Sequence, residues 1–255
     1  MWKVYKYTLL DLARNRFALG YALLLMLSSV GLFMLEADNT KALISLTQVV
    51  LALVPLLALV FSIIYFYNQL EFTVLLAVQP LRRRSILRAQ FLAVSTALLA
   101  SFLLGVGLPV VAYAPGPIGW TLLLTGAALT MVFCALGIFI AVRQRDRAKA
   151  VGIGLATWVF MVLVYDSLLL WLMFSFSDRP IEPVIVPLAA LNPIDLSRIL
   201  IMLKIDLAAL LGYTGAVYQQ FFGSMGGMLV ALLALLLWIQ LPSMAAGRAF
   251  ARKDL

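Results

Sequence analysis

The chain has 255 residues, of which 64% are hydrophobic and only 12% are charged. Soluble domains contain about 45–50% apolar and about 25% charged residues, so lipid must be the solvent for most of this surface. Histidine is absent, which removes the commonest general base and the commonest metal ligand, and a single cysteine excludes a disulfide framework. The composition predicts a polytopic membrane protein, in which the distribution of the net charge of +8 matters more than its size.

The first apolar run is preceded by residues 1–16, where Trp2, Tyr5, Leu9 and Leu12 recur at helical spacing between basic residues. This pattern predicts a short helix lying in the cytoplasmic membrane interface, with an ordinary charged flank as the alternative.

Six stretches are long enough to cross a bilayer, which takes about 20 mostly apolar residues. They are Phe17–Leu35, Ala42–Tyr67, Ala89–Tyr113, Ile118–Val142, Ala150–Phe174 and Met225–Leu241. The first is predicted to be an uncleaved span, because it is longer than the apolar region of a signal peptide. Residues 17–174 therefore carry five spans, and residues 225–255 carry the sixth span and a tail.

The lysines and arginines alternate strictly between the two sides of these spans. Fifteen of the 19 flank the N-terminus, the connections after the second and fourth spans, and the tail, whereas four lie on the other side. By the positive-inside rule, both termini are predicted to be cytoplasmic, in a multi-pass protein of the bacterial inner membrane.

Residues 68–80 form a short apolar helix after the second span. Its 12 residues from Asn68 to Gln79 make about 18 Å of helix, which cannot cross a bilayer. Its apolar side chains point in nearly every direction, and a helix that is apolar all round is usually buried. Another protein is therefore expected to cover part of it, with a plain re-entrant connector as the alternative. Glu71 suits the first turn, and Pro80 ends the helix before Arg82, Arg83 and Arg84.

Residues 175–224 form a long external segment before the last span. Its residues 178–187, DRPIEPVIVP, are predicted to be extended because they are rich in proline. Asn192 is the predicted N-cap of a following helix, with Pro193 at the first helical position and Asp195 in the first turn. A second short helix is expected from Asp206. These helices should lie on the membrane or against a partner.

Asp166 is the one ionisable residue well inside a predicted span. Such a group costs about 2.5–3.5 kcal/mol on insertion scales, so function is the first hypothesis. Asp166 is a candidate for lining a transport pathway. The alternatives are structural pairing with a neighbouring helix or a second copy, and a position in the interface if the span ends near Tyr165.

No catalytic residue is predicted. The sequence lacks a P-loop, H-E-x-x-H and G-x-S-x-G, so energy from ATP must come from a partner and the chain is not expected to be an enzyme. No metal site is predicted from Cys134 and the methionines, which are ordinary in membrane helices. An intramembrane enzyme would need several converging polar groups, of which Asp166 is one; a scaffold without transport remains a further alternative.

Three stretches resemble the type-2 class of ABC transporter permeases, and within it the permeases that serve maturation of nitrous-oxide reductase. They are NQLEFTVLLAVQPLRRRSILRAQFL, the external NPIDLSRILIMLKIDLAALLGYTGAVYQQFFGS and the tail AGRAFARKDL. The resemblance covers nearly the whole chain and implies an all-α fold with six spans, cytoplasmic termini and a coupling helix that docks on a separate ATPase. The matching coupling positions are Glu71, Phe72, Thr73, Leu75, Leu76, Pro80, Arg82, Arg83 and Arg84, and a second contact includes Arg143 and Arg145.

The same resemblance implies a complex of two permease copies, two cytoplasmic ATPases that hold ATP and Mg²⁺, and a periplasmic β-helix protein. Asn192, Pro193, Asp195 and Arg198 are the expected contacts with that periplasmic partner. Such a complex supports assembly of a copper–sulfide centre by moving sulfur, moving copper or transmitting force. This chain would hold no cofactor, contact membrane lipid and bind no nucleic acid. The alternative within the same fold is a permease that exports a lipid, peptide or drug.

Overall fold

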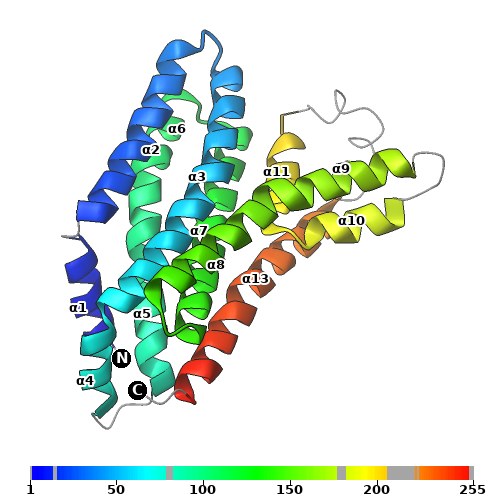
Figure 1. The fold of residues 1–255 in the computed structure, drawn as a ribbon. Coiled ribbons are helices and arrows are strands. Elements are labelled where there is room, and N and C mark those ends of the chain that lie inside the picture. Colours follow the sequence, from blue (N-terminus) through cyan, green and yellow to red (C-terminus); the bar gives the residue numbers. More distant parts are fainter. Residues whose placement is uncertain are drawn as a thin grey trace.

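A computed structural model describes residues 2–13, 16–78, 83–176, 182–205, 222 and 224–252, which form helices joined by turns (Figure 1). In chain order the helices are α1 (Trp2–Ala13), α2 (Arg16–Leu35), α3 (Asn39–Asn68), α4 (Leu70–Val78), α5 (Arg83–Phe102), the π-helix η1 (Leu103–Gly107), α6 (Leu108–Tyr113), α7 (Pro117–Arg143), α8 (Arg147–Val159), the π-helix η2 (Phe160–Val164), α9 (Tyr165–Ser175), α10 (Glu182–Ala190), α11 (Pro193–Met202) and α13 (Met225–Ala251).

Six helical stretches of the described chain are long and apolar enough to cross a membrane. They are Arg16–Leu35, Asn39–Asn68, Arg83–Tyr113, Pro117–Arg143, Arg147–Leu172 and Gly226–Ala251. The prediction of an all-α polytopic membrane protein with six spans is thus confirmed. The fifth of these stretches, which joins α8, η2 and α9 end to end, is called span five below.

The centre of the bundle is formed by α3 and α7. Of the 18-residue apolar stretch in each helix, 72% is buried in α7 and 61% is buried in α3. The two helices approach each other closely at Gly137, where an added Cβ would lie 2.7 Å from the carbonyl oxygen of Leu59. Because real Cβ atoms do not come that close to a backbone oxygen, this contact requires glycine.

The outer layer contains span five and α13. Only 11% of the corresponding 18-residue stretch is buried in span five, and only 17% is buried in α13. A second, smaller core joins α9, α10, α11 and α13 through Leu169, Ala189, Leu196 and Leu235. In Figure 1, α9 and α10 lie side by side and extend away from the bundle. The large exposed apolar faces of the outer layer are those of a protein surrounded by lipid or by further subunits.

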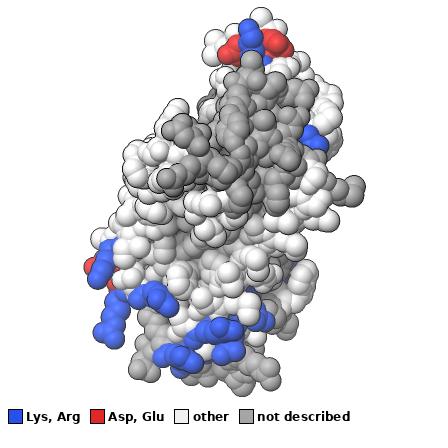
Figure 2. Space-filling model, turned by 90° about the vertical axis from the view of Figure 1, so that its right-hand side faces the viewer, with Lys and Arg blue, Asp and Glu red and all other residues white. Residues whose placement is uncertain are grey.

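The bundle has two different ends. Both termini, α4 and the α7–α8 turn lie at one end, here called the terminal end, and the α2–α3 and α6–α7 turns lie at the far end (Figure 1). Figure 2 shows the molecule turned by 90° from Figure 1, and most of the Lys and Arg side chains on the face seen there lie near the terminal end. This arrangement agrees with the charge alternation, and the cytoplasmic location of the terminal end remains a prediction.

Two expectations about the sequence near the C-terminus need correction. Residues 178–187 are not extended throughout, because α10 begins at Glu182. Pro183 falls in its first turn, where a missing N–H costs no helical bond, and Ile185 and Ala189 are buried one turn apart. The last helix continues ten residues beyond the predicted end at Leu241, because Ala246 and Phe250 pack into the core. The helix predicted from Asp206 lies outside the described residues.

Candidate functional site

The short helix α4 has one face buried in the chain and one face exposed. Thr73 and Leu76, one turn apart, are buried, whereas Phe72 is 41% and Leu75 68% exposed. The structure describes this helix over Leu70–Val78; Asn68 of the predicted 68–80 belongs to α3, and residues 79 and 80 lie outside the described residues. Exposed apolar side chains at i and i+3 on a helix beside the bundle form a ridge suited to a groove in another protein.

A chain of hydrogen bonds holds α4 in place. The Gln90 side-chain amide of α5 donates to the Thr73 hydroxyl at 2.7 Å, and that hydroxyl donates to the Gln69 carbonyl at 2.7 Å. The Gln69 side chain donates to the Asp11 carboxylate of α1 at 3.0 Å. A displacement of α4 must therefore either break these hydrogen bonds or move α1 and α5 with it. Asp11 and Gln90 were not among the predicted site residues, although a glutamine in an apolar span is a signal that a buried polar partner exists.

The α7–α8 turn lies beside the corner between α3 and α4. The Tyr67 hydroxyl is within 3.2–3.3 Å of the carbonyl oxygens of Ala141, Gln144 and Asp146. Arg147, the first residue of α8, donates to the Asn68 side-chain oxygen at 3.2 Å. The two predicted ATPase contacts, α4 and the turn that carries Arg143 and Arg145, are thereby brought to one end of the molecule.

The other predicted coupling residues are placed as follows. Glu71, Arg84, Arg143 and Arg145 are exposed. Arg143 lies over the Phe139 ring, 4.9 Å from the ring centroid, in a cation–π contact. Arg83 is half-buried and interacts within the chain. Pro80 and Arg82 lie outside the described residues. Coupling by these side chains remains a prediction. Because Thr73 and Leu76 are buried within the chain, only their neighbours on the exposed face of α4 are open to an ATPase.

A polar cluster of Asp166, Asn192, Asp195 and Arg198 joins span five to α11. The Arg198 guanidinium is 2.8 Å from Asp166 Oδ2 and 3.3 Å from Asp195 Oδ1. Asp166 lies 19 residues beyond Arg147, which is about 28 Å along span five and so towards the far end. Asp166 thus pairs within its own chain, and its role in a pathway remains a prediction.

Asn192 organises the start of α11, as predicted. Its side-chain oxygen accepts from the Ile194 N–H at 3.1 Å, which confirms the N-cap. Its amide nitrogen donates to Asp195 Oδ2 and to the Met161 carbonyl, both at 2.7 Å. Met161 belongs to η2, and π-helical turns are frequent at functional positions. The cap of α11 is therefore bonded directly to the irregular part of span five.

The acidic groups of the polar cluster differ in environment. Burial raises the pKa of Asp195 to about 6, against the opposing effect of the nearby Arg198 guanidinium. Asp166, in contrast, is 37% exposed. Beside the cluster, the Tyr165 hydroxyl donates to the Leu188 carbonyl at 2.6 Å and ties α9 to α10. The helices before α13 are thus fastened to span five at several points.

The four residues expected to contact a periplasmic partner face the inside of this chain. Asn192, Pro193 and Asp195 are buried, and the Arg198 side chain is 20% exposed. Val184 of α10 and Leu191, which follows that helix, are exposed apolar residues of the same segment. Partner contact by the four predicted residues remains untested, whereas their role in positioning α11 follows from the bonds above.

Six apolar spans, a non-spanning helix with an exposed apolar ridge at the terminal end and a helical segment before the last span define a multi-pass membrane protein. Two curated proteins are similar to this chain over most of its length. It is 30% identical over 231 residues, 82% of this chain and 84% of the relative, to the probable ABC transporter permease protein NosY of Pseudomonas aeruginosa. It is 28% identical over 280 positions, 99% of this chain and 98% of the relative, to the probable ABC transporter permease protein NosY of Stutzerimonas stutzeri.

The chain belongs to the NosY family of ABC transporter permeases. This confirms the predicted resemblance to ABC transporter permeases of this kind. No family model matches the chain.

Proposed function

We propose that this chain couples ATP hydrolysis by a separate ATPase to movement of the helices before α13, for maturation of the copper–sulfide centre of nitrous-oxide reductase. The proposed complex contains a second copy of the chain, two NosF-like ATPases with bound ATP and Mg²⁺, and a NosD-like periplasmic β-helix protein. It lies in the bacterial inner membrane with both termini cytoplasmic. The observation that carries the proposal is the exposed apolar ridge of α4, Phe72 and Leu75, at the terminal end.

The ridge is suited to protein contact for two reasons. Phe72 and Leu75 lie one turn apart, beside the carboxylate of Glu71, so they can enter an apolar groove while Glu71 meets a basic side chain at its edge. The exposed Arg143 and Arg145 lie at the same end and extend the contact surface. A surface that combines apolar anchors with charged surroundings is typical of protein interfaces.

Span five provides a continuous route from this surface to the helices before α13. It starts at Arg147, which is bonded to Asn68 beside α4, and it reaches the polar cluster through η2. A movement of the α3–α4 corner is therefore passed to α11 through bonded, helical elements. Rigid-body switching of this kind requires firm connections and no catalytic side chains.

The test is co-purification of the ATPase with the double variant Phe72→Ala, Leu75→Ala. We expect the ATPase to be lost while the variant is still inserted and folded, because both side chains are already exposed. The matched control is Met34→Ala, Leu35→Ala, which removes two exposed apolar side chains at the far end. Retention of the ATPase by the α4 variant at the level of the control would contradict the proposal.

A further inference from the structure

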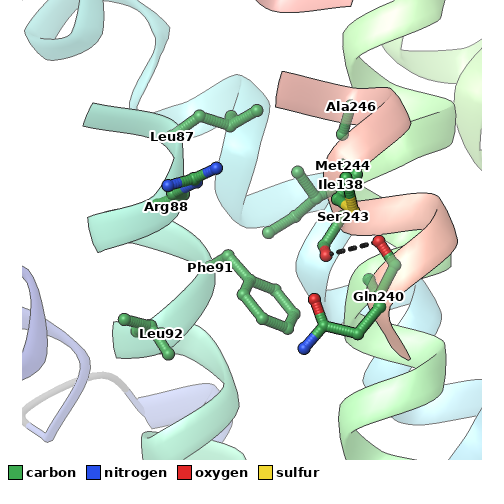
Figure 3. Close-up of a pocket in the computed structure, with 10 residues that line it drawn as sticks. Leu87, Arg88, Phe91, Leu92, Ile138, Gln240, Ser243, Met244 and Ala246 are labelled. Carbon is green, nitrogen blue, oxygen red and sulfur yellow. Dashed lines mark hydrogen bonds between the residues drawn. The ribbon is translucent and has the colours of Figure 1, made fainter. Parts of the chain in front are cut away.

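A groove of about 380 Å³ opens between α5 and α13 near the terminal end (Figure 3). Arg88 and Leu92 form its edge on α5, and Gln240 and Met244 form its edge on α13; all four are exposed. Its floor is made by the buried Ala135 and Ile138 of α7. Leu87, Phe91, Ser243 and Ala246 complete its lining. The small side chain of Ala135 gives the groove its depth.

The polar groups of the groove are not used within the chain. Arg88 forms no hydrogen bond or ion pair with the described residues, and neither does the side-chain amide of Gln240. Figure 3 shows that amide directed across the groove towards Phe91. The Ser243 hydroxyl donates to the Gln240 backbone carbonyl at 2.9 Å and leaves the amide open. The groove therefore offers an unpaired cation and an unpaired amide among apolar side chains.

The order of these groups along the membrane normal is informative. Helix α5 begins at the terminal end, so Arg88 lies near that end. Helix α13 runs towards the terminal end, so Gln240 lies about one turn, or ~6 Å, deeper than Met244. A phospholipid has the same order: a phosphate at the surface, ester carbonyls below it and then acyl chains.

We propose that this groove binds one anionic phospholipid from the leaflet at the terminal end. Arg88 pairs with the phosphate, as guanidinium groups do in two-bond geometry, and the Gln240 amide donates to an ester carbonyl. An acyl chain continues from there along Phe91 and Leu92 over Ala135, which lie deeper than Arg88 and Ile138. A free inorganic anion would leave this apolar lining uncovered, and an apolar helix of a second copy would bury Arg88 and Gln240 without partners, which is unfavourable.

The first test is native mass spectrometry of the full-length chain in detergent with added phosphatidylglycerol. We expect a retained lipid adduct, reduced about tenfold or more in Arg88→Gln, the loss expected for one charge-assisted hydrogen bond. Arg88→Lys should retain an intermediate amount. The control is Arg16→Gln, an exposed arginine of α2 that does not line the groove. Equal retention by Arg88→Gln, equal binding of phosphatidylcholine, or displacement of the lipid by inorganic phosphate would overturn the proposal.

A second test identifies the occupant in native membranes. A photo-crosslinking residue in place of Met244 should give an adduct with the mass of a phospholipid, and Ser243→Phe, which fills the groove and keeps Arg88, should abolish it. Cross-linking to a second copy of the chain or to another protein would overturn the proposal. An adduct of unchanged yield in the Ser243→Phe background would do the same, because the lipid would then lie outside the groove.

Discussion

The terminal end and the polar cluster have opposite relations between polarity and burial. On α4, apolar side chains such as Leu75 are exposed, and a single buried threonine contacts the chain through a hydrogen bond. At the polar cluster, the charged groups Asp195 and Arg198 are turned inwards and the apolar Leu191 is exposed nearby. Both arrangements are unfavourable for an isolated subunit in water, but for different reasons.

The difference separates surfaces for partners from internal connections. An exposed apolar ridge gains stability only when another molecule covers it, so it indicates an interface. A buried cluster of charges is tolerated only when its members satisfy one another, so it indicates a connection within the chain. Exposure is therefore the more direct indicator of a surface that is open to another molecule.

The largest effect is expected for Arg198→Ala. This change leaves the buried Asp195 without its cation, and breaking a buried ion pair from one side costs about 3 kcal/mol or more. The free energy of unfolding, measured by denaturation from mixed micelles, should fall by that amount. Lys204→Ala, an exposed change in the following turn, is the control and should leave it unchanged.

The assignment of Arg198 can be checked further by a second substitution. Asp195→Asn in the Arg198→Ala background removes the uncompensated charge and should restore part of the lost stability. If Arg198→Ala unfolds like the unsubstituted chain, the cluster does not connect span five to α11, and the contrast between the two ends is lost.

An intermediate effect is expected at α4. Thr73→Val removes the hydroxyl that accepts from Gln90 and leaves a buried amide donor unpaired, at a cost of about 2 kcal/mol. Gln90→Leu should cost less, because it also removes Oε1, which has no hydrogen-bond partner among the described residues. Unfolding free energies of the two variants, measured side by side, test this order; a larger loss for Gln90→Leu would show that packing, rather than the hydrogen bond, holds α4.

The smallest effect is a dependence on pH that only the polar cluster should show. The pKa of Asp195 is raised to about 6, so its protonated form contributes stability that is present below the ordinary pKa near 3.8 and lost as the pH rises through 6. Between pH 5 and pH 7 the free energy of unfolding should fall by about 1 kcal/mol. Asp195→Asn should abolish this component, whereas Thr73→Val should leave it intact because the Thr73–Gln90 contact carries no titratable group.

The spans could be predicted from the sequence because they depend on a local property, the length of an apolar run. The cap at Asn192 was predictable for the same reason, since an N-cap satisfies backbone groups two residues away. The helix α10 was missed because proline content alone suggested an extended chain, while burial of Ile185 and Ala189 decides the outcome. The extension of α13 was missed because its stabilising contact joins Phe250 to the distant Phe66.

The orientation of individual side chains on the candidate surfaces could not be predicted from the sequence. The sequence indicated that another protein covers part of residues 68–80, but it could not distinguish the buried Thr73 and Leu76 from the exposed Phe72 and Leu75. That distinction depends on Gln90, 17 residues further along. Likewise, Asp166 was recognised as unusual, but its partner Arg198 is 32 residues away and was assigned to another surface. Side chains that pair across such separations produce no helical or strand periodicity, so the pairing cannot be recognised in the sequence.

The exposure of span five has an energetic consequence for motion. Where its exposed apolar side chains meet lipid tails, which are as apolar as the side chains themselves, a change in its tilt requires almost no transfer of surface between unlike solvents. Its buried side is held by apolar packing, in which Gly154 lies against Leu59 and Ile63. A few polar contacts add to this resistance: Arg147 with Asn68, Trp158 with the Ala52 carbonyl at 3.1 Å, and Asp166 with Arg198. Single substitutions can remove these polar contacts one at a time.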